Sequence, residues 1–213
     1  MTQQHAIVYP LFSTPVYHVE DTGFRPSKLI IDQLIALPRS SAPGLSEDRF
    51  ILRLPFMHEI KRLVEYHLDN YVKQVCGITE SFEVTNSWIT VNSDGVDHYR
   101  HLHPNSIFSG TFYLQAEEGS SPIQFHGKHK LTPDFNFTWN LSEQNVYNSE
   151  NWIVPIQTGT LTLFPSSLEH SAPKNASINP RVCLGFNAFV RASFGDKSYA
   201  SDIDLTGMKH YYD

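Results

Sequence analysis

The chain has 213 residues, of which 40% are hydrophobic and 18% are charged. This length and composition predict one globular domain and argue against disorder. The net charge of -6, with 16 scattered basic residues, argues against a nucleic-acid partner held through its phosphates. No apolar run of about 20 residues occurs, so we expect no membrane association.

Two features indicate the compartment. Cys76 and Cys183 lie in apolar surroundings and form no CxxC pair, which predicts buried free thiols in a reducing cytosol. The first residues, MTQQHAIVYPLF, lack the basic start and the continuous apolar run of a signal peptide. We therefore expect a cytoplasmic protein.

Helical patterns are confined to residues 1–80. Apolar residues recur at helical spacing between residues 26 and 36, and Pro38 follows as a stop. A longer pattern begins near Pro55, which suits a first helical turn, and keeps one apolar face until Gly77. We predict two helices that pack on one face of a sheet.

From Phe82 onward the chain consists of short β-favouring segments, separated by Gly, Pro, Asn and Asp. The segments are FEVTNSWITV, SIFSGTFYL, SPIQF, FNFTW, NWIVPI, GTLTLF and RVCLGFNAFV. They predict a mainly β core over residues 81–195, as a sandwich, jelly roll or barrel, followed by a C-terminal tail at 196–213. The stretch from Gly127 to Asn151 is either a lid over a site or a hairpin packed by its own aromatic residues.

Histidines in the β region form a candidate metal site. If the segment HLH is extended, His101 and His103 point to one side of the strand, while Leu102 points to the other side, into packing. An HxH pair is weak evidence by itself. His170 strengthens it, because it follows a strand that Pro165 breaks, at a position that suits a third ligand.

Arg181 is a candidate anion-binding residue. It opens the segment RVCLGFNAFV, whose apolar residues indicate a core strand. An arginine that enters a core strand needs an anionic partner, and its planar guanidinium matches a carboxylate. The alternative is a surface arginine at a strand start, but the proximity of His170 in the sequence favours a site.

Five segments together resemble a known family. They are YPLFSTPVY (9–17), Trp88 with ITVN, HLHPNSIFSGTFYL (101–114), PIQTGTLTLFPSSLEHSAPKN (155–175) and PRVCLGFN (180–187). In order and spacing they resemble the Fe(II)/2-oxoglutarate-dependent oxygenases, and within them the 2OG-Fe(II) oxygenases of marine bacteria and their phages. The resemblance runs over nearly the whole chain.

The resemblance implies a double-stranded β-helix, with the N-terminal helices packed on one sheet. It implies that His101, His103 and His170 bind Fe(II), that Arg181 binds the distal carboxylate of 2-oxoglutarate, and that Tyr113 lies in the cosubstrate pocket. It further implies oxidation of an organic substrate with release of succinate and CO2. Hydroxylation of a prolyl or another amino-acid side chain is one candidate reaction.

One departure from the family concerns the metal ligands. Most of these oxygenases have HxD or HxE where this chain has HxH, so the carboxylate is missing from its usual place. Asp97 and Glu169 are the candidate substitutes. His98, His126 and His129 are interpreted as surface or substrate-facing residues, because three ligands already complete the protein's share of an octahedral site.

Two other functions stay open at this point. One is a cupin-like metalloenzyme with three histidines that uses no 2-oxoglutarate, and the other is a non-catalytic jelly-roll binding or structural protein. Arg181 favours the oxygenase, because a cosubstrate carboxylate needs it. We expect a small-molecule or peptidyl substrate, and exposed strand edges with the aromatic stretch 135–152 make a homodimer plausible.

Overall fold

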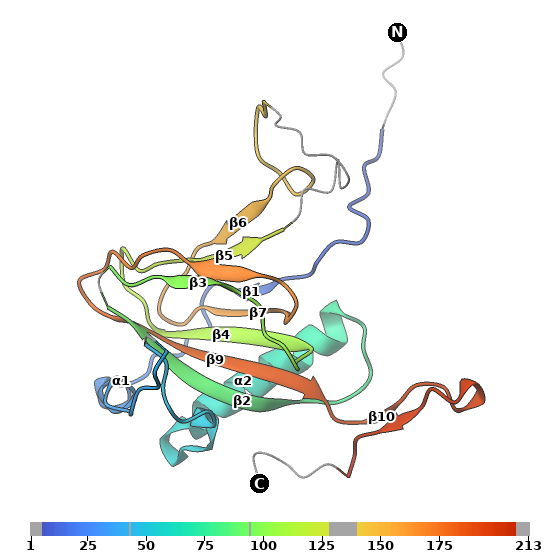
Figure 1. The fold of residues 1–213 in the computed structure, drawn as a ribbon, viewed down its shortest axis with the longest axis horizontal. Coiled ribbons are helices and arrows are strands. Elements are labelled where there is room, and N and C mark those ends of the chain that lie inside the picture. Colours follow the sequence, from blue (N-terminus) through green and yellow to red (C-terminus); the bar gives the residue numbers. More distant parts are fainter. Residues whose placement is uncertain (1–5, 43, 94, 128–139, 208–213) are drawn as a thin grey trace.

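The computed structural model describes residues 6–42, 44–93, 95–127 and 140–207. Two antiparallel sheets face each other, the smaller one drawn above the larger one in Figure 1. The larger sheet has the order β1 (Tyr17–Val19), β7 (Leu161–Pro165), β4 (Phe108–Gln115), β9 (Arg181–Val190) and β2 (Phe82–Asn92). The smaller sheet has the order β3 (His98–His101), β8 (His170–Ala172), β5 (Ile123–His126) and β6 (Asn151–Val154). This is the double-stranded β-helix, or jelly roll, that the sequence predicts.

Most of the predicted strand segments form strands. Strands β2, β4, β5, β6, β7 and β9 coincide with six of them, and the seventh, residues 135–139, lies outside the described residues. The short strands β1 and β8 have no alternating pattern of their own. Strand β1 forms because it pairs with the backbone of β7, and β8 forms because it pairs with β3 and β5 on either side. Strand β1 thus lies within the region expected to be helical.

Two helices cover the outer face of the larger sheet, as predicted. Helix α1 (Lys28–Ile35) begins after Ser27, whose hydroxyl accepts a hydrogen bond from the Ile30 amide at 3.4 Å. Helix α2 (His58–Asn70) follows the 3-10 turns η1 (Ile51–Arg53) and η2 (Pro55–Met57) and continues as the π-helical turn η3 (Tyr71–Val75).

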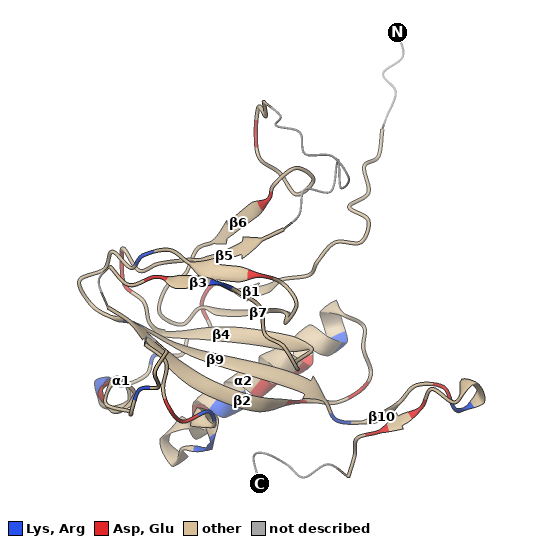
Figure 2. Ribbon diagram, viewed as in Figure 1, with Lys and Arg blue, Asp and Glu red and all other residues tan. Residues whose placement is uncertain are grey.

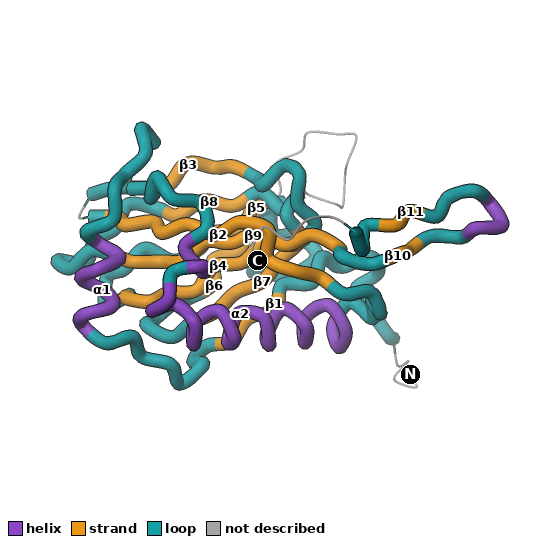
Figure 3. Tube along the Cα trace, turned by 90° about the horizontal axis from the view of Figure 1, so that it is seen from below, coloured by secondary structure: helices purple, strands orange, loops and turns teal. Residues whose placement is uncertain are grey.

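The main apolar core lies between α2 and the larger sheet, which run side by side in Figures 1 and 3. Ile60, Val64 and Leu68 of the helix share one buried cluster with Phe112 and Leu184 of the strands. Each buried side chain of this kind contributes about 1.5–3 kcal/mol to folding. The apolar residues of the strands therefore face the helix, and the alternate residues face the smaller sheet, where the site lies.

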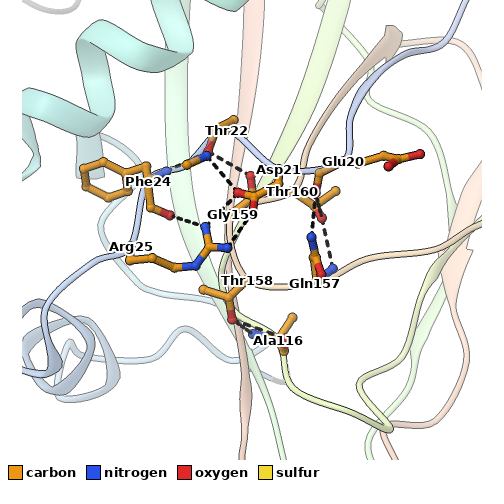
Figure 4. A network of polar contacts seen from close by, with 11 residues as sticks. Glu20, Asp21, Thr22, Phe24, Arg25, Ala116, Gln157, Thr158, Gly159 and Thr160 are labelled. Carbon is orange, nitrogen blue, oxygen red and sulfur yellow. Dashed lines mark hydrogen bonds and ion pairs between the residues drawn. The ribbon is translucent and has the colours of Figure 1, made fainter.

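A polar network attaches the N-terminal segment to the loop before β7 (Figure 4). The backbone amide and the hydroxyl of Thr22 both donate to the Gly159 carbonyl, at 3.0 and 2.8 Å. The Thr160 hydroxyl donates to the Glu20 carbonyl at 2.8 Å. Gly159 has φ +94°, and a Cβ there would collide with the Arg25 guanidinium, so this position requires glycine. The network holds β1 at the edge of the larger sheet.

A hairpin projects from the body at the C-terminal end (Figure 1). It consists of β10 (Ser193–Phe194) and β11 (Ile203–Asp204), with the 3-10 turn η4 (Lys197–Tyr199) between them. The boundary expected between core and tail, at residue 196, therefore falls inside this hairpin. Within the described ranges, no helix has both the length and the apolar character needed to cross a membrane.

Charged side chains of both signs are interspersed over the elements (Figure 2). The helical pairs Lys28 with Asp32 and Lys73 with Asp69 are exposed, so they add little to stability. The two cysteines are free, as expected, but only Cys183 is buried. Cys76 is half-buried, because it caps the C-terminal end of η3 at the surface.

Candidate metal and cosubstrate site

Three histidines meet at the end of the smaller sheet. His101 is the last residue of β3 and lies directly opposite His170, the first residue of β8. His103 follows two residues after the end of β3. One potential ligand atom from each ring lies within 4.8 Å of the others. The structure thus brings together the three histidines that the sequence singles out.

The local backbone differs from the expected extended HLH segment. Strand β3 ends at His101, and the amide of His103 donates to the Ser166 carbonyl at 3.0 Å instead of continuing the ladder with β8. Pro104, which has no amide hydrogen, follows directly. Leu102 is 45% exposed, so the prediction that it packs inward is wrong. His103 thus lies beyond the last paired residue of β3, directly before the turn at Pro104 and Asn105.

Two of the rings are oriented by the nitrogen that faces away from the group. Nδ1 of His101 lies 2.8 Å from the Tyr99 carbonyl, and Nδ1 of His170 lies 3.1 Å from the Leu168 carbonyl. Because a carbonyl only accepts, both Nδ1 atoms must donate, which leaves both Nε2 atoms with free lone pairs. Nε2 of His170 lies 3.2 Å from Nε2 of His103.

Burial favours the neutral form of two of these imidazoles. Burial, together with the nearby His101, lowers the pKa of His103 to about 4 and that of His170 to about 3. The rings of His103 and His170 are therefore uncharged near pH 7, the form in which histidine binds a metal. Three imidazole nitrogens that converge on one point suit iron, zinc or copper. The donor set thus fits a bound transition metal.

The candidate carboxylates do not join this group. Glu169 is ion-paired with Arg100, whose Nε donates to the Glu169 carboxylate at 3.0 Å. Asp97 is exposed and lines a neighbouring cavity. Among the described residues, the only group able to hold a metal consists of the three histidines. The HxH sequence therefore produces an all-histidine set.

Arg181 is a buried cation without a carboxylate partner among the described residues. Its side chain is 4% exposed, so the alternative of a surface arginine is wrong. Nη1 donates to the Ser121 carbonyl at 2.9 Å, but Nε has no partner. The guanidinium carbon lies 5.7 Å from the ring centre of Tyr113, which is also buried. An unpaired buried charge is costly, so this position calls for an anion.

Two adjoining cavities surround the histidines. The smaller one is lined by all three histidines together with Arg181 and Tyr113. The larger one has a volume of about 600 Å³, within the range of pockets that bind organic molecules. His98 lines both cavities, which agrees with a substrate-facing residue, although it is half-buried and not a surface residue.

The other expected histidines lie apart from the group. His126 is hydrogen-bonded to Asn151 and Ser171, at 2.5 and 2.8 Å. His129 lies outside the described residues, as do residues 128–139 of the proposed lid with Phe135, Phe137 and Trp139. Tyr147 is described and is 41% exposed.

Sequence reasoning gave no role to three residues that the structure places at the site. Trp88 stacks on His103 with ring centres 5.4 Å apart, and Asn187 and Arg49 line the larger cavity together with His103. Trp88 and Asn187 do stand in the motifs quoted above. Arg49 lies far from them in the sequence and carries no pattern that could have identified it.

Residues 86–187 match the model of a family described as "Putative 2OG-Fe(II) oxygenase". The matched residues run from β2 through most of β9 and include all three histidines, Tyr113 and Arg181. Over this core the chain is similar to the 2OG-Fe(II) oxygenase family. No curated protein sequence matches the chain.

Solved structures share the fold of this oxygenase core. An oxidoreductase of the 2OG-Fe(II) oxygenase family from Burkholderia pseudomallei is 16% identical over 75% of this chain and 76% of its own, with a TM-score of 0.51. The epimerase SnoN, in complex with Fe3+, alpha ketoglutarate and nogalamycin RO, is 14% identical over 92% and 88%, with a TM-score of 0.59. HygX from Streptomyces hygroscopicus, with nickel, 2-oxoglutarate and hygromycin B bound, is 13% identical over 82% of both chains, with a TM-score of 0.57.

Proposed function

We propose that this oxygenase binds Fe(II) through His101, His103 and His170, and 2-oxoglutarate through Arg181. The observation that carries the proposal is the buried guanidinium, which has no anionic partner among the described residues and lies in the same small cavity as the three histidines. A dicarboxylate matches this arrangement, because one carboxylate can pair with Arg181 while the other end reaches the metal. SnoN and HygX, with 2-oxoglutarate or alpha ketoglutarate bound, support the assignment.

Iron in this site would couple the oxidation of the substrate to that of 2-oxoglutarate. One atom of dioxygen would enter a substrate C–H bond and form a hydroxyl group. The other atom would enter 2-oxoglutarate, which is converted to succinate and CO2. The chain's own residues position and shield the reactants. The carbonyls of Tyr99 and Leu168 hold two ligand rings in one tautomer. Tyr113 and Arg181, both buried, form the closed end of the cosubstrate cavity and keep bulk water from it.

The larger cavity is the proposed substrate site, because it shares the walls formed by Trp88, His101 and His103 with the cosubstrate cavity. Arg49 lines it and is half-buried, and its guanidinium makes no ion pair within the described part of the chain. Its backbone is held against β2, since the Ser87 amide donates to the Arg49 carbonyl at 2.7 Å. We propose an organic substrate with an anionic group, such as an amino acid or peptide with a free carboxylate.

Anaerobic titration tests the proposed function. Fe(II)-loaded protein is titrated with 2-oxoglutarate while the visible charge-transfer band of the chelated cosubstrate is followed. We expect the band in the wild type and its loss, at the same 2-oxoglutarate concentration, in Arg181→Ala. Iron binding without the band would point to a three-histidine enzyme that uses no 2-oxoglutarate. Absence of iron binding would overturn the proposal.

A further inference from the structure

Strand β6 is an edge of the smaller sheet with apolar residues on its surface. It lies at the end of the order β3-β8-β5-β6 and, among the described residues, pairs only with β5. Trp152 and Ile153 point to opposite faces of the strand, and both are exposed. Edge strands of soluble proteins usually carry a charged residue or a proline that prevents pairing with another strand, but residues 151–154 contain neither. The backbone of β6 can therefore accept one more strand.

A second segment without a partner strand precedes β1. Residues 6–11 form an arm that extends away from the body (Figure 1), and within the described ranges they make no hydrogen bond to the rest of the molecule. Ile7, Val8, Tyr9 and Leu11 are 65–69% exposed. Three of these, Ile7 to Tyr9, are consecutive residues that favour strands. The arm is thus a potential strand that has no sheet of its own to join.

The base of the arm lies beside β6. Val16 packs against the buried apolar cluster that contains Val154 of β6. The pairing of β1 with β7 and the polar network of Figure 4 fix this base in place. From there, residues 6–14 can span about 30 Å when extended, which is far enough to reach a neighbouring molecule. A second copy that approaches this edge can therefore contact the arm and β6 at once.

We propose that this edge is the interface of a homodimer, in which the arm of each copy adds to β6 of the other copy as an outer strand. A two-fold axis relates the two strand pairs, so one symmetric contact covers both edges. The strands match in length, because the four residues from Ala6 to Tyr9 precede Pro10, and the four residues of β6 precede Pro155. Proline has no amide hydrogen, so the pairing ends at both prolines.

The exposed apolar surface is large enough for a stable dimer. It is formed by Ile7, Val8, Tyr9, Leu11, Trp152 and Ile153. With about 100 Å² for a whole aliphatic and about 200 Å² for a whole aromatic side chain, these six expose about 500 Å² in each copy. Two copies would cover about 1,000 Å² before any backbone is counted, which is the size expected of a specific interface. A second copy fits better than a different partner, because this chain itself supplies both complementary strands.

Sedimentation of the full chain at several concentrations tests the dimer. We expect a wild-type dimer whose dissociation constant rises at least about tenfold in Val8→Asp and in Trp152→Glu, because each substitution places an unpaired charge in the interface. Ile178→Asp is the matched control, since Ile178 is 97% exposed and lies outside both strands, and this variant should dimerise as the wild type does. A monomeric wild type, or a dimer that either interface substitution leaves unchanged, would overturn the proposal.

Hydrogen exchange tests whether the arm lies on β6. In the wild-type dimer, the amides of residues 7–9 and the β6 amides that do not pair with β5 should exchange slowly. Val8→Asp should speed exchange in β6, although the substitution lies in the arm, and Trp152→Glu should speed exchange in the arm. Exchange in β9 should stay as in the wild type, which shows that both variants are folded. If Val8→Asp leaves exchange in β6 unchanged, or if both strands are protected in a monomer, the inference is wrong.

Discussion

The Nε2 atoms of His103 and His170 face each other at 3.2 Å, and the His170 ring holds its proton on the opposite nitrogen, against the Leu168 carbonyl. Because His170 Nε2 can only accept, this contact requires a proton on Nε2 of His103 in the metal-free protein. A metal ion bound by both rings would displace that proton.

Replacement of His170 by alanine should abolish metal-dependent stabilisation. A metal present at 100 times its Kd stabilises a protein by about 2.7 kcal/mol, which raises the melting temperature measurably. We expect this rise with Fe(II) under anaerobic conditions in the wild type and none in His170→Ala. His126→Ala serves as the control, because His126 lies outside the three-histidine group. An equal rise in His170→Ala would show that the metal binds elsewhere.

Replacement of Arg181 should weaken the binding of 2-oxoglutarate and leave the binding of the metal unchanged. Hydrogen bonds to a charged group contribute about 1.5–3 kcal/mol, so Arg181→Ala should weaken 2-oxoglutarate binding by about 10–100-fold. Calorimetry with metal-loaded protein measures this loss. Arg191→Ala, at the far end of β9, should bind 2-oxoglutarate as the wild type does. If Arg181→Ala binds 2-oxoglutarate as tightly as the wild type, Arg181 is not part of the cosubstrate site.

Arg49 should determine which substrates are accepted. With a set of matched organic molecules, each in a carboxylate and an amide form, we expect the carboxylates to stimulate succinate production more strongly. In Arg49→Gln this preference should fall by about tenfold, while turnover of 2-oxoglutarate without substrate stays the same. A preference that persists in Arg49→Gln would place the anion-binding residue elsewhere in the cavity.

Gly185 should not tolerate a side chain, because a Cβ there would lie 2.5 Å from the ring of Trp88. Trp88 would have to shift, and His103 stacks on it. Overpacking of this kind costs about 1–3 kcal/mol. We expect urea unfolding to show this loss in Gly185→Ala, together with weaker metal binding. Gly207→Ala, where no atom lies within 4 Å, should match the wild type in both measurements.

His67 should make stability depend on pH. Burial lowers the pKa of this ring, which is hydrogen-bonded to Tyr17 at 2.9 Å. Below about pH 6.5 His67 is protonated in the unfolded chain but stays neutral in the folded chain. The free energy of unfolding therefore falls as the pH falls. Between pH 7.5 and 5.5 this one group can contribute at most about 1.4 kcal/mol. Urea unfolding at both pH values should show a smaller loss in His67→Gln, and an equal loss would contradict the assignment.

The sequence alone was enough to predict the fold class and to select the three histidines. Alternating apolar residues in strands such as β4 and β9 reflect a sheet with two different faces, and this pattern is local. The periodicity of α2 is local as well, so its position in the chain was predictable. The short strands β1 and β8 were not, because three residues carry no pattern and their existence depends on their partners.

Only the tertiary structure decided how the site is built. His103 was expected at a strand position, but β3 ends at His101, and the His103 amide is bonded to the Ser166 carbonyl. Trp88, which stacks on its ring, and Asn187, which lines the same cavity, come from different strands, and Arg49 comes from a loop before β2. Contacts between residues so far apart in the sequence depend on the register of the sheets. Residue types can therefore reveal which chemistry is available, whereas packing determines which atoms face one another.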